Sequence, residues 1–393
     1  MLPLDDLTVV DLTRALAGPY CTMMLADMGA RVIKIETPDG GDDTRGWGPP
    51  FIRGESAYFM SINRNKSSVT LNLRDTRARD LLWRLLARAD VLVENFRPGA
   101  MDRLGFGYDA VRAALPRLVY CSISGFGQTG PYRERAAYDL IVQGMGGLMG
   151  ITGEPDGAPM RVGVAVADIG AGMFAAYAVL AALRVRDRTG RGQRVDASML
   201  DGQVAWMTYM AANYFATGRD PARVGSAHTN LVPYQPFRTS DGFVNVAVGS
   251  EGLWQRFCGA VGLPLAADPR FATNADRVAH RDELLAALRP VFAARTTADW
   301  VAHLMEHGVP AGPISRVHEV MEDPQVRERG MVVEIEHPRA GRVRVNGVPV
   351  KLSETPGVVR TPPPELGEHT EAVLRELGVP PEDVVALRRD AVI

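Results

Sequence analysis

Short apolar runs alternate with segments of helical apolar spacing through the first part of the chain. Residues 7–12 (LTVVDL) form a β-branched run, and residues 20–28 then carry apolar side chains at helical spacing as far as Gly29. Residues 31–36 (RVIKIE) form a second apolar run soon afterwards. A strand, a helix and a strand joined by short connections make a βαβ unit, whose two strands pair in parallel.

The same alternation recurs before residue 125. Residues 76–88 place leucines on one side of a predicted helix, and residues 90–94 (DVLVE) follow as a strand. Residues 108–115 and 118–123 repeat the order of helix and strand. The pattern predicts an α/β fold, with a Rossmann-like large domain built on a parallel sheet.

The second half of the chain has a different organisation. We expect a long Ala-rich helix over residues 169–183, a strand over 193–198 and a helix over 202–217, which complete a large α/β domain at 1–217. Residues 218–230 are then a linker, and residues 231–312 form a smaller α+β domain that begins with a strand–turn–strand pattern. Residues 313–393 contain a strand pair within 332–350 and a final amphipathic helix at 370–377.

Composition excludes several classes of protein. The 393 residues include 44 Lys and Arg against 46 Asp and Glu, a formal net charge of −2, which argues against nucleic-acid and polybasic membrane binding. Three scattered cysteines, Cys21, Cys121 and Cys258, exclude a disulfide scaffold and favour a reducing compartment. No signal peptide and no run of about 20 apolar residues is present. We expect a cytoplasmic protein that does not interact with a membrane.

Two motifs suggest other chemistry on a first reading. Residues 125–130 (GFGQTG) match the dinucleotide turn GxGxxG, but no ribose-binding acid ends a strand about 20 residues later, so an NAD-dependent dehydrogenase is a minor alternative to a glycine-rich turn. His303 and His307 match the zinc pattern HxxEH, yet Gly308 and Pro310 end that helix at once. We expect no metal site.

One carboxylate stands out. An apolar run leads directly to Asp168, which we expect to open the Ala-rich helix, and Asp is a preferred N-cap residue. The small residues that follow, Gly170, Ala171 and Gly172, permit close approach of a ligand or another chain segment. The preceding residues 144–159 are rich in glycine, as the wall of a pocket requires.

These segments together resemble the family III coenzyme A transferases. The resemblance extends over nearly the whole chain and rests on blocks such as VVDLTRALAGPY, NRNK, VENFRPG, YCSISGFGQTGP, RVGVAVADI, VPYQPFRTSDG and LGEHT. Within the family, the chain looks most like the branch that moves CoA between succinate and other dicarboxylates such as glutarate or hydroxymethylglutarate. It departs from the oxalate-using branch at Leu16, where that branch has Gln, and at Thr37, where it has a basic residue.

The resemblance implies that Asp168 is the catalytic nucleophile. Its carboxylate would attack the thioester, forming an acyl-aspartyl anhydride and then an aspartyl-CoA thioester. With a reference pKa of about 3.9 and a helix N-terminus beside it, we expect an ionised carboxylate that needs no neighbouring base. Coenzyme A would be a substrate, with no permanently bound cofactor. Its implied contacts are Ala17, Leu71, Asn72, Leu73, Arg74, Asn95, Phe96, Arg97, Arg103, Tyr138 and Asp139.

The acceptor acid is less well defined by the sequence. Arg14, Leu16, His228 and Tyr234 are candidate substrate contacts, because a polar or cationic side chain can orient a distal carboxylate. A linker role for His228 and a surface role for Arg14 are equally open. The same superfamily contains 2-methylacyl-CoA racemases, whose catalytic His falls at Tyr138 here; a Tyr is a poor base near neutral pH. A non-catalytic CoA-binding protein is a further alternative.

The resemblance also implies an assembly. Family III members form interlocked homodimers in which each chain is threaded through the other, and the C-terminal tail returns to the large domain. We therefore expect a homodimer that acts on acyl-CoA and small carboxylic acids.

Overall fold

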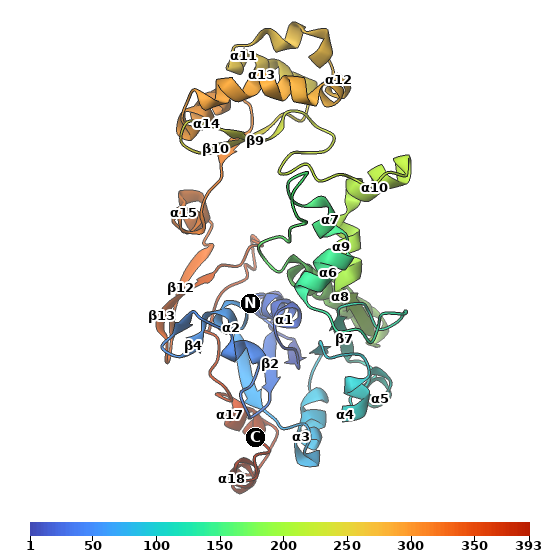
Figure 1. Ribbon diagram of the computed structural model, residues 1–393. Helices are drawn as coiled ribbons and strands as arrows, with labels where there is room; N and C mark the ends of the chain where they lie inside the picture. The colour runs from blue at the N-terminus through green and yellow to red at the C-terminus, as the bar shows by residue number, and fades with distance from the viewer. The chain divides into compact units, whose positions relative to one another are not determined.

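The computed structural model describes residues 1–393, which divide into two compact units (Figure 1). Unit 1 comprises Met1–Leu148, Arg161–Thr217 and Pro324–Ile393, and unit 2 comprises Met149–Met160 and Gly218–Asp323. The chain therefore leaves unit 1 twice and returns to it for the C-terminal tail. Residues 149–160, which the sequence pattern gave to the large domain, are grouped with unit 2.

Unit 1 is built on a parallel sheet of six strands in the order β5-β2-β1-β6-β7-β8. All neighbouring pairs are parallel, so the predicted α/β class is confirmed. The chain adds strands on one side of β1 and then crosses to add β6, β7 and β8 on the other side. The strands are β1 (Thr8–Asp11), β2 (Arg31–Glu36), β5 (Lys66–Thr70), β6 (Val91–Glu94), β7 (Val119–Ser124) and β8 (Arg194–Ser198).

Side chains alternate between two buried faces of this sheet. Val10 and Ile33 pack on one face with helices α3 (Thr76–Leu86), α17 (Thr370–Glu376) and α18 (Pro381–Arg389). Val9 and Val32 pack on the other face with α1 (Ala17–Asp27) and α8 (Val166–Thr189). Burial on both faces explains why β6 begins with three consecutive apolar residues, VLV, instead of alternating apolar and polar ones.

The C-terminal tail is part of this core. Thr370 Oγ1 accepts a hydrogen bond from the Thr70 N–H at 3.0 Å, and the Asn72 N–H donates to Val392 O at 2.8 Å. The red C-terminal helices accordingly lie beside the blue strands of unit 1 in Figure 1. The sequence pattern predicted α17 but missed α18 and the strand β5.

The long helix α8 has 24 residues and is long and apolar enough to cross a membrane, judged by length and composition alone. In this structure Ala167, Ala171, Ala175 and Val179 pack into the core of unit 1. Gly190, with φ of 73°, ends α8 in the left-handed conformation that favours glycine at this position. The helix begins at Val166 with Ala165 as its N-cap, so the expectation that Asp168 is the N-cap is wrong by three residues.

The remaining elements of unit 1 are shorter. The single helix predicted over residues 202–217 is divided at Met207 into α9 (Met199–Trp206) and α10 (Thr208–Thr217). The strand pair predicted within 332–350 is confirmed as β12 (Val332–His337) and β13 (Gly341–Asn346). The others are β3 (Phe51–Ile52), β4 (Glu55–Ser56), α2 (Ala57–Ile62), α4 (Ala100–Leu104), α5 (Tyr108–Ala114), α6 (Asp139–Met145) and α16 (Pro324–Glu328), with α7 (Leu148–Ile151) at the boundary.

Unit 2 has its own small sheet and core. The sheet is antiparallel, in the order β11-β10-β9, and its aromatic core contains Trp254, Phe257, Phe292 and Trp300. In Figure 1 its helices α11–α14 group beside β9 and β10. The elements are β9 (Tyr234–Arg238), β10 (Phe243–Ala247), α11 (Glu251–Val261), α12 (Asn274–Ala279), α13 (Arg281–Ala293), α14 (Thr297–Glu306), β11 (Ala311–Pro313) and α15 (Val317–Glu322).

Candidate active site

The candidate site residues of unit 1 follow the carboxyl ends of parallel strands. The turn with Arg14, Leu16 and Ala17 follows β1, and the segment from Asn95 to Arg97 follows β6, the strand paired with β1 on its other side. The strand order reverses between these two strands. Ligands of open α/β sheets bind at such a switch point, outside the carboxyl ends of the strands.

Asn95 joins the two loops at this point. Its Oδ1 accepts a hydrogen bond from the Arg14 N–H at 2.9 Å, and its Nδ2 donates to the Arg14 carbonyl at 2.8 Å. The Arg14 guanidinium lies 5.6 Å from the centre of the Phe96 ring. The structure thus brings Arg14, Asn95 and Phe96 together, with the exposed cationic side chains of Arg97 and Arg103 on the following segment.

The segment after β5 has mixed surroundings. Leu71 is buried in the core, whereas Arg74 is exposed at the surface. Asn72 contacts the last residues of the chain, and the carbonyls of Leu73 and Arg74 accept hydrogen bonds from the Arg79 side chain at 3.2 Å. The segment lies at the carboxyl edge of the sheet, where a ligand can bind, although the Leu71 side chain packs in the core.

Asp168 is the third residue of α8 and is half-buried. Burial, together with the negative charge of Asp139, raises the pKa of its carboxyl group to about 7, while a hydrogen bond from the Ala17 backbone N–H acts in the opposite direction. The expectation of an ordinary, fully ionised carboxylate is therefore wrong. Near pH 7 both protonation states of Asp168 are populated.

The first turn of α8 is held by a neighbouring acid. Asp139 Oδ1 accepts from the Ala167 N–H at 3.0 Å, and its Oδ2 accepts from Gln143 Nε2 at 2.8 Å. The Gln143 Oε1 in turn accepts from the Val162 N–H at 2.9 Å. Asp139 is buried, whereas the preceding side chain, Tyr138, is 68 % exposed.

A tyrosine that the sequence did not single out faces the same carboxylates. Burial and the charges of Asp168, Asp139 and Asp42 raise the pKa of Tyr58 to about 12. Tyr58 also borders an apolar hollow of about 1060 Å³ in unit 1, together with Leu16 and Ile169. Only the folded chain brings Tyr58 near Asp168, so no local sequence signal could identify it.

The last two candidate substrate residues lie in unit 2. The His228 N–H donates to Tyr234 O at 2.9 Å, and the two rings are 5.3 Å apart between centres. They form a local pair at the entrance to β9.

The two alternative motifs have ordinary structural roles. Residues 125–130 form a turn after β7, and the next helix, α6, begins only at Asp139, so no helix N-terminus faces that turn. His303 Nε2 lies 2.9 Å from Ala260 O, and His307 Nδ1 lies 2.9 Å from His303 O. In residues 1–393 no group of three or more His, Cys, Asp or Glu side chains is arranged to hold a metal ion.

Comparison with known proteins identifies the class. The sequence profile of CoA-transferase family III matches residues 4–370. Succinyl-CoA:glutarate CoA-transferase of Mus musculus is 44 % identical over 96 % of this chain and 87 % of the mouse protein. Succinate--glutarate CoA-transferase of Agrobacterium fabrum is 45 % identical over 95 % of this chain and 96 % of that protein.

A solved structure agrees. A CAIB/BAIF family protein from Brucella suis superposes with a TM-score of 0.85 at 45 % identity, covering 96 % of this chain and 99 % of that one. The chain belongs to CoA-transferase family III. It is an enzyme, a CoA-transferase that acts on CoA thioesters.

Proposed function

We propose that this CoA-transferase moves CoA from succinyl-CoA to a longer dicarboxylate such as glutarate, with Asp168 as its nucleophile. The observation that supports the nucleophile best is the environment of Asp168 in the first turn of α8. There the carboxylate faces the Ala17 N–H and has a pKa near neutrality. The names of the relatives, two of them succinate–glutarate CoA-transferases, support the pair of acids.

The chemistry needs four balanced steps. An Asp168 oxygen attacks the thioester carbonyl, the C–S bond breaks, CoA leaves as the thiolate, and an acyl-aspartyl mixed anhydride remains. The thiolate attacks the Asp168 carbonyl carbon and releases the donor acid, which leaves an aspartyl-CoA thioester. The acceptor carboxylate attacks that thioester to form a second anhydride and thiolate, and the thiolate finally takes the acceptor acyl group and regenerates Asp168. Each step exchanges one activated acyl group for another.

Raised basicity suits this role. A carboxylate whose pKa is near 7 is a stronger nucleophile than an ordinary one, and about half of it is ionised at pH 7. Tetrahedral intermediates form at the Asp168 carbonyl carbon in the middle steps. The Ala17 N–H is then a donor that can stabilise their oxyanion.

The exposed arginines fit the polyanionic part of CoA. Arg97 and Arg103 follow β6, and a guanidinium can bind phosphate oxygens in a bidentate manner. Phe96 offers an aromatic ring beside the Arg14 guanidinium. We place the nucleotide end of CoA over these residues and its thioester end toward Asp168.

The apolar surroundings of Leu16 support an acid with methylene groups. Leu16 packs with Met23 and Ile62 and against the half-buried Tyr58 and Ile169. The three methylenes of glutarate can contact such a surface, whereas oxalate has none. Leu16→Gln is accordingly expected to lower kcat/KM for glutarate relative to oxalate.

An exchange assay tests this function. Purified protein is incubated with succinyl-CoA and, separately, glutarate, hydroxymethylglutarate, citramalate, mesaconate, oxalate and formate, and new thioesters are identified by mass. Wild type should form glutaryl-CoA, and Asp168→Ala should form none. Asp383→Ala removes an exposed acid in the first turn of α18 and should keep wild-type activity. Transfer by Asp168→Ala at the wild-type rate would overturn the nucleophile.

The exposed apolar surface of unit 1 supports the expected homodimer. Large apolar side chains of α6, α8, α9 and α10 face outward, and contiguous patches of this kind mark interaction sites. They include Leu140, Ile141, Met173, Phe174, Tyr177, Trp206, Tyr214 and Phe215. We propose that these helices meet a second copy of the chain. Light scattering should give twice the chain mass of 42.6 kDa, and a monomer at micromolar concentration would contradict the proposal.

The cysteines bear on the compartment. Cys21, Cys121 and Cys258 are all free and buried, and burial raises the pKa of each thiol. Unreactive free thiols are consistent with the cytoplasmic location that we propose. Fractionation of the source cell tests it.

A further inference from the structure

Three neighbouring strands of unit 1 carry charged side chains at buried positions. Asp11 of β1 lies beside Lys34 of β2 in the sheet register, and Lys34 lies beside Ser68 of β5. Glu36 and Lys66 occupy the same face of the same strands, where α1 covers the sheet. All of these side chains are buried, so the sheet contains a row of charges where alternation would otherwise place apolar residues.

The charges are mutually paired. Lys66 Nζ lies 3.2 Å from Asp11 Oδ2, Lys34 Nζ lies 2.8 Å from Asp42 Oδ2, and Arg45 Nη2 lies 2.7 Å from Glu36 Oε1. Burial opposes these charges, but the neighbouring cations hold the pKa of Asp11 at about 2. For Lys34, the charges of Asp11, Asp42 and Glu36 outweigh burial and raise its pKa.

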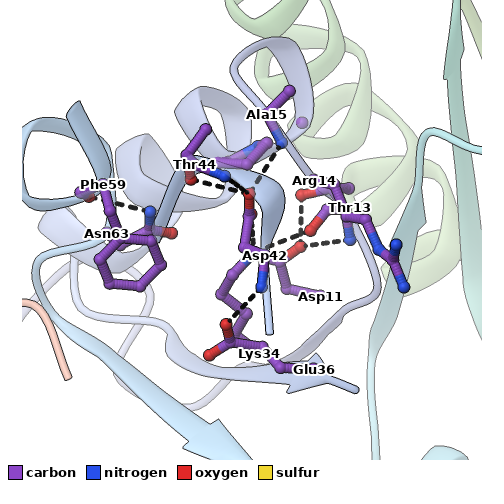
Figure 2. Close-up of polar contacts among 12 residues, drawn as sticks. Asp11, Thr13, Arg14, Ala15, Lys34, Glu36, Asp42, Thr44, Phe59 and Asn63 are labelled. Atoms are coloured by element: carbon purple, nitrogen blue, oxygen red, sulfur yellow. Dashed lines mark hydrogen bonds and ion pairs between the residues drawn. The ribbon is translucent and has the colours of Figure 1, made fainter. Parts of the chain in front are cut away.

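The Lys34–Asp42 pair is attached to the turn after β1 at both ends (Figure 2). Lys34 Nζ donates to Thr13 O at 2.7 Å, and Asp42 Oδ1 accepts from the Ala15 N–H at 3.2 Å. Asn95 holds both backbone groups of the residue between them, Arg14. Three consecutive residues of the turn are therefore fixed through their backbone by side chains from other segments.

The turn also has an unfavourable backbone conformation. Ala15 has φ of 62°, in the left-handed region that costs a residue with a Cβ about 1 kcal/mol or more. A buried ion pair is itself seldom more stable than an apolar pair of the same volume. A gain in stability therefore explains neither the left-handed Ala15 nor the buried ion pair. Both are found at the turn that leads into Leu16 and the first N–H groups of α1.

The end of that turn meets Asp168. Gly172 lies one helical turn after Asp168 on α8, and a Cβ on it would lie 2.6 Å from the Ala17 carbonyl oxygen. The Asp168 face of α8 is thus packed directly against the start of α1. A shift of the turn would move the Ala17 N–H relative to the Asp168 carboxylate.

We propose that Lys34 and Asp42, the two side chains of this buried ion pair, are a positioning device for the transferase reaction: Lys34 holds Thr13 O and Asp42 holds the Ala15 N–H, so that the start of α1 stays packed against the Asp168 face of α8. The inference rests on the proposed function of Asp168. Lys34 and Asp42 are positioning residues: they act on the reaction only through the turn.

Two substitutions of Asp42 separate this role from a general contribution to folding. Asp42→Asn and Asp42→Ala remove the same charge and leave Lys34 equally unpaired. Asparagine keeps the Oδ1 acceptor for the Ala15 N–H, whereas alanine removes it. Asp42→Ala should lower kcat at least about tenfold with little change in KM, since the loss concerns the reacting carboxylate.

The pH profile gives the specific readout. Besides Ala17, the groups facing Asp168 are Asp139 and Tyr58. Arg161 Nη1 lies 3.9 Å from Asp139 Oδ2. None of these changes in the two variants. Loss of the Ala17 hydrogen bond should move the rising limb of kcat/KM upward by about 0.5 pH unit or more in Asp42→Ala, and much less in Asp42→Asn.

A matched control lies at the other end of β1. Arg186 Nη1 pairs with Asp90 Oδ1 at 2.7 Å, and Asp90 Oδ2 accepts from the Thr8 N–H at 2.8 Å. Asp90→Asn/Arg186→Met should lower Tm without moving the limb. If Asp42→Ala does not fold, Lys34→Met/Asp42→Asn is measured instead. It leaves no unpaired charge in the pair and should show the shift because it removes the Lys34 hydrogen bond to Thr13 O.

The outcomes are distinct. A shifted limb in Asp42→Ala, or in the double variant, with an unshifted limb in the Asp90 control supports the proposal. The proposal is overturned if Asp42→Ala and Asp42→Asn have the same kcat and the same pH dependence of kcat/KM. It is also overturned if a folded Lys34→Met/Asp42→Asn shows no shift of that pH dependence, or if the Asp90 control shifts as far as Asp42→Ala. Transfer by Asp168→Ala would instead overturn the proposed function itself.

Discussion

Gly172 of α8 faces the carbonyl oxygen of Ala17, and no side chain fits between them. A Cβ built on Gly172 would lie 2.6 Å from that oxygen and 3.3 Å from the Cys21 nitrogen, both backbone atoms of α1. The two helices can approach this closely only because position 172 has no side chain. The contact sets the distance between the start of α1 and Asp168.

Gly172→Ala should therefore be destabilising and should impair activity. Overpacking against backbone costs about 1–3 kcal/mol, which exceeds the gain of up to about 1 kcal/mol from better helix propensity. We expect a lower free energy of unfolding in urea and a lower kcat, because α1 moves away from Asp168.

Gly259→Ala is the matched control. Gly259 lies inside α11, and a Cβ there meets no atom within 4 Å. That substitution should leave activity unchanged and raise stability by up to about 1 kcal/mol. Equal effects of the two substitutions would refute the packing argument.

Activity should depend on pH through Asp168. Only the ionised carboxylate attacks the thioester, and its pKa is raised to about 7, so kcat/KM should rise with pH across that value. Asp139→Asn removes the neighbouring negative charge and should move the rising limb to lower pH. The rate–pH profile of the free enzyme measures this, and a flat profile from pH 5 to 8 would contradict it.

The free energy of unfolding should also depend on the ionisation of Asp168, but it should fall as pH rises, whereas activity increases. The folded pKa of Asp168, about 7, lies above the ordinary value of 3.8, so the folded state binds the proton more tightly than the unfolded state. Its contribution is favourable below pH 4 and is lost as pH rises toward 7. Asp168→Asn should therefore gain stability over wild type on going from pH 4 to pH 8 in urea titrations. A constant difference would argue against the raised pKa.

The C-terminal tail should matter for the stability of unit 1. Leu374 of α17 is 1 % exposed and packs in the same core as Val10 and Ile33. Leu374→Ala should cost about 2–5 kcal/mol. Val385→Ala in α18, at a side chain that is 68 % exposed, should change stability by less than about 0.5 kcal/mol. Calorimetry distinguishes the two.

Strand periodicity carried much of the fold prediction. RVIKIE predicts β2 correctly because its apolar residues alternate and turn signals precede it. The polar sequence of β5, KSSVT, gives no such signal, because Lys66 and Ser68 are buried through their charged and polar partners. The break at Met207, which separates α9 from α10, is likewise invisible in the apolar pattern.

The site was only partly predictable. Resemblance drew attention to Asp168 and Asn95, and the apolar run before Asp168 supported the first. Lys34 and Glu36 alternate within a strand that is buried on both faces, which is a usable sign of a buried ionic cluster. The partners they choose, and the approach of Tyr58 to Asp168, depend on contacts between distant segments.

The most direct test concerns the covalent intermediate. Enzyme is mixed with succinyl-CoA without an acceptor, quenched in acid, and analysed by intact and peptide mass spectrometry. The proposed mechanism predicts a CoA adduct on the peptide that contains Asp168, which disappears when glutarate is added and is absent in Asp168→Ala. Exchange activity without any adduct on that peptide, or an adduct on a different residue, would contradict Asp168 as the nucleophile.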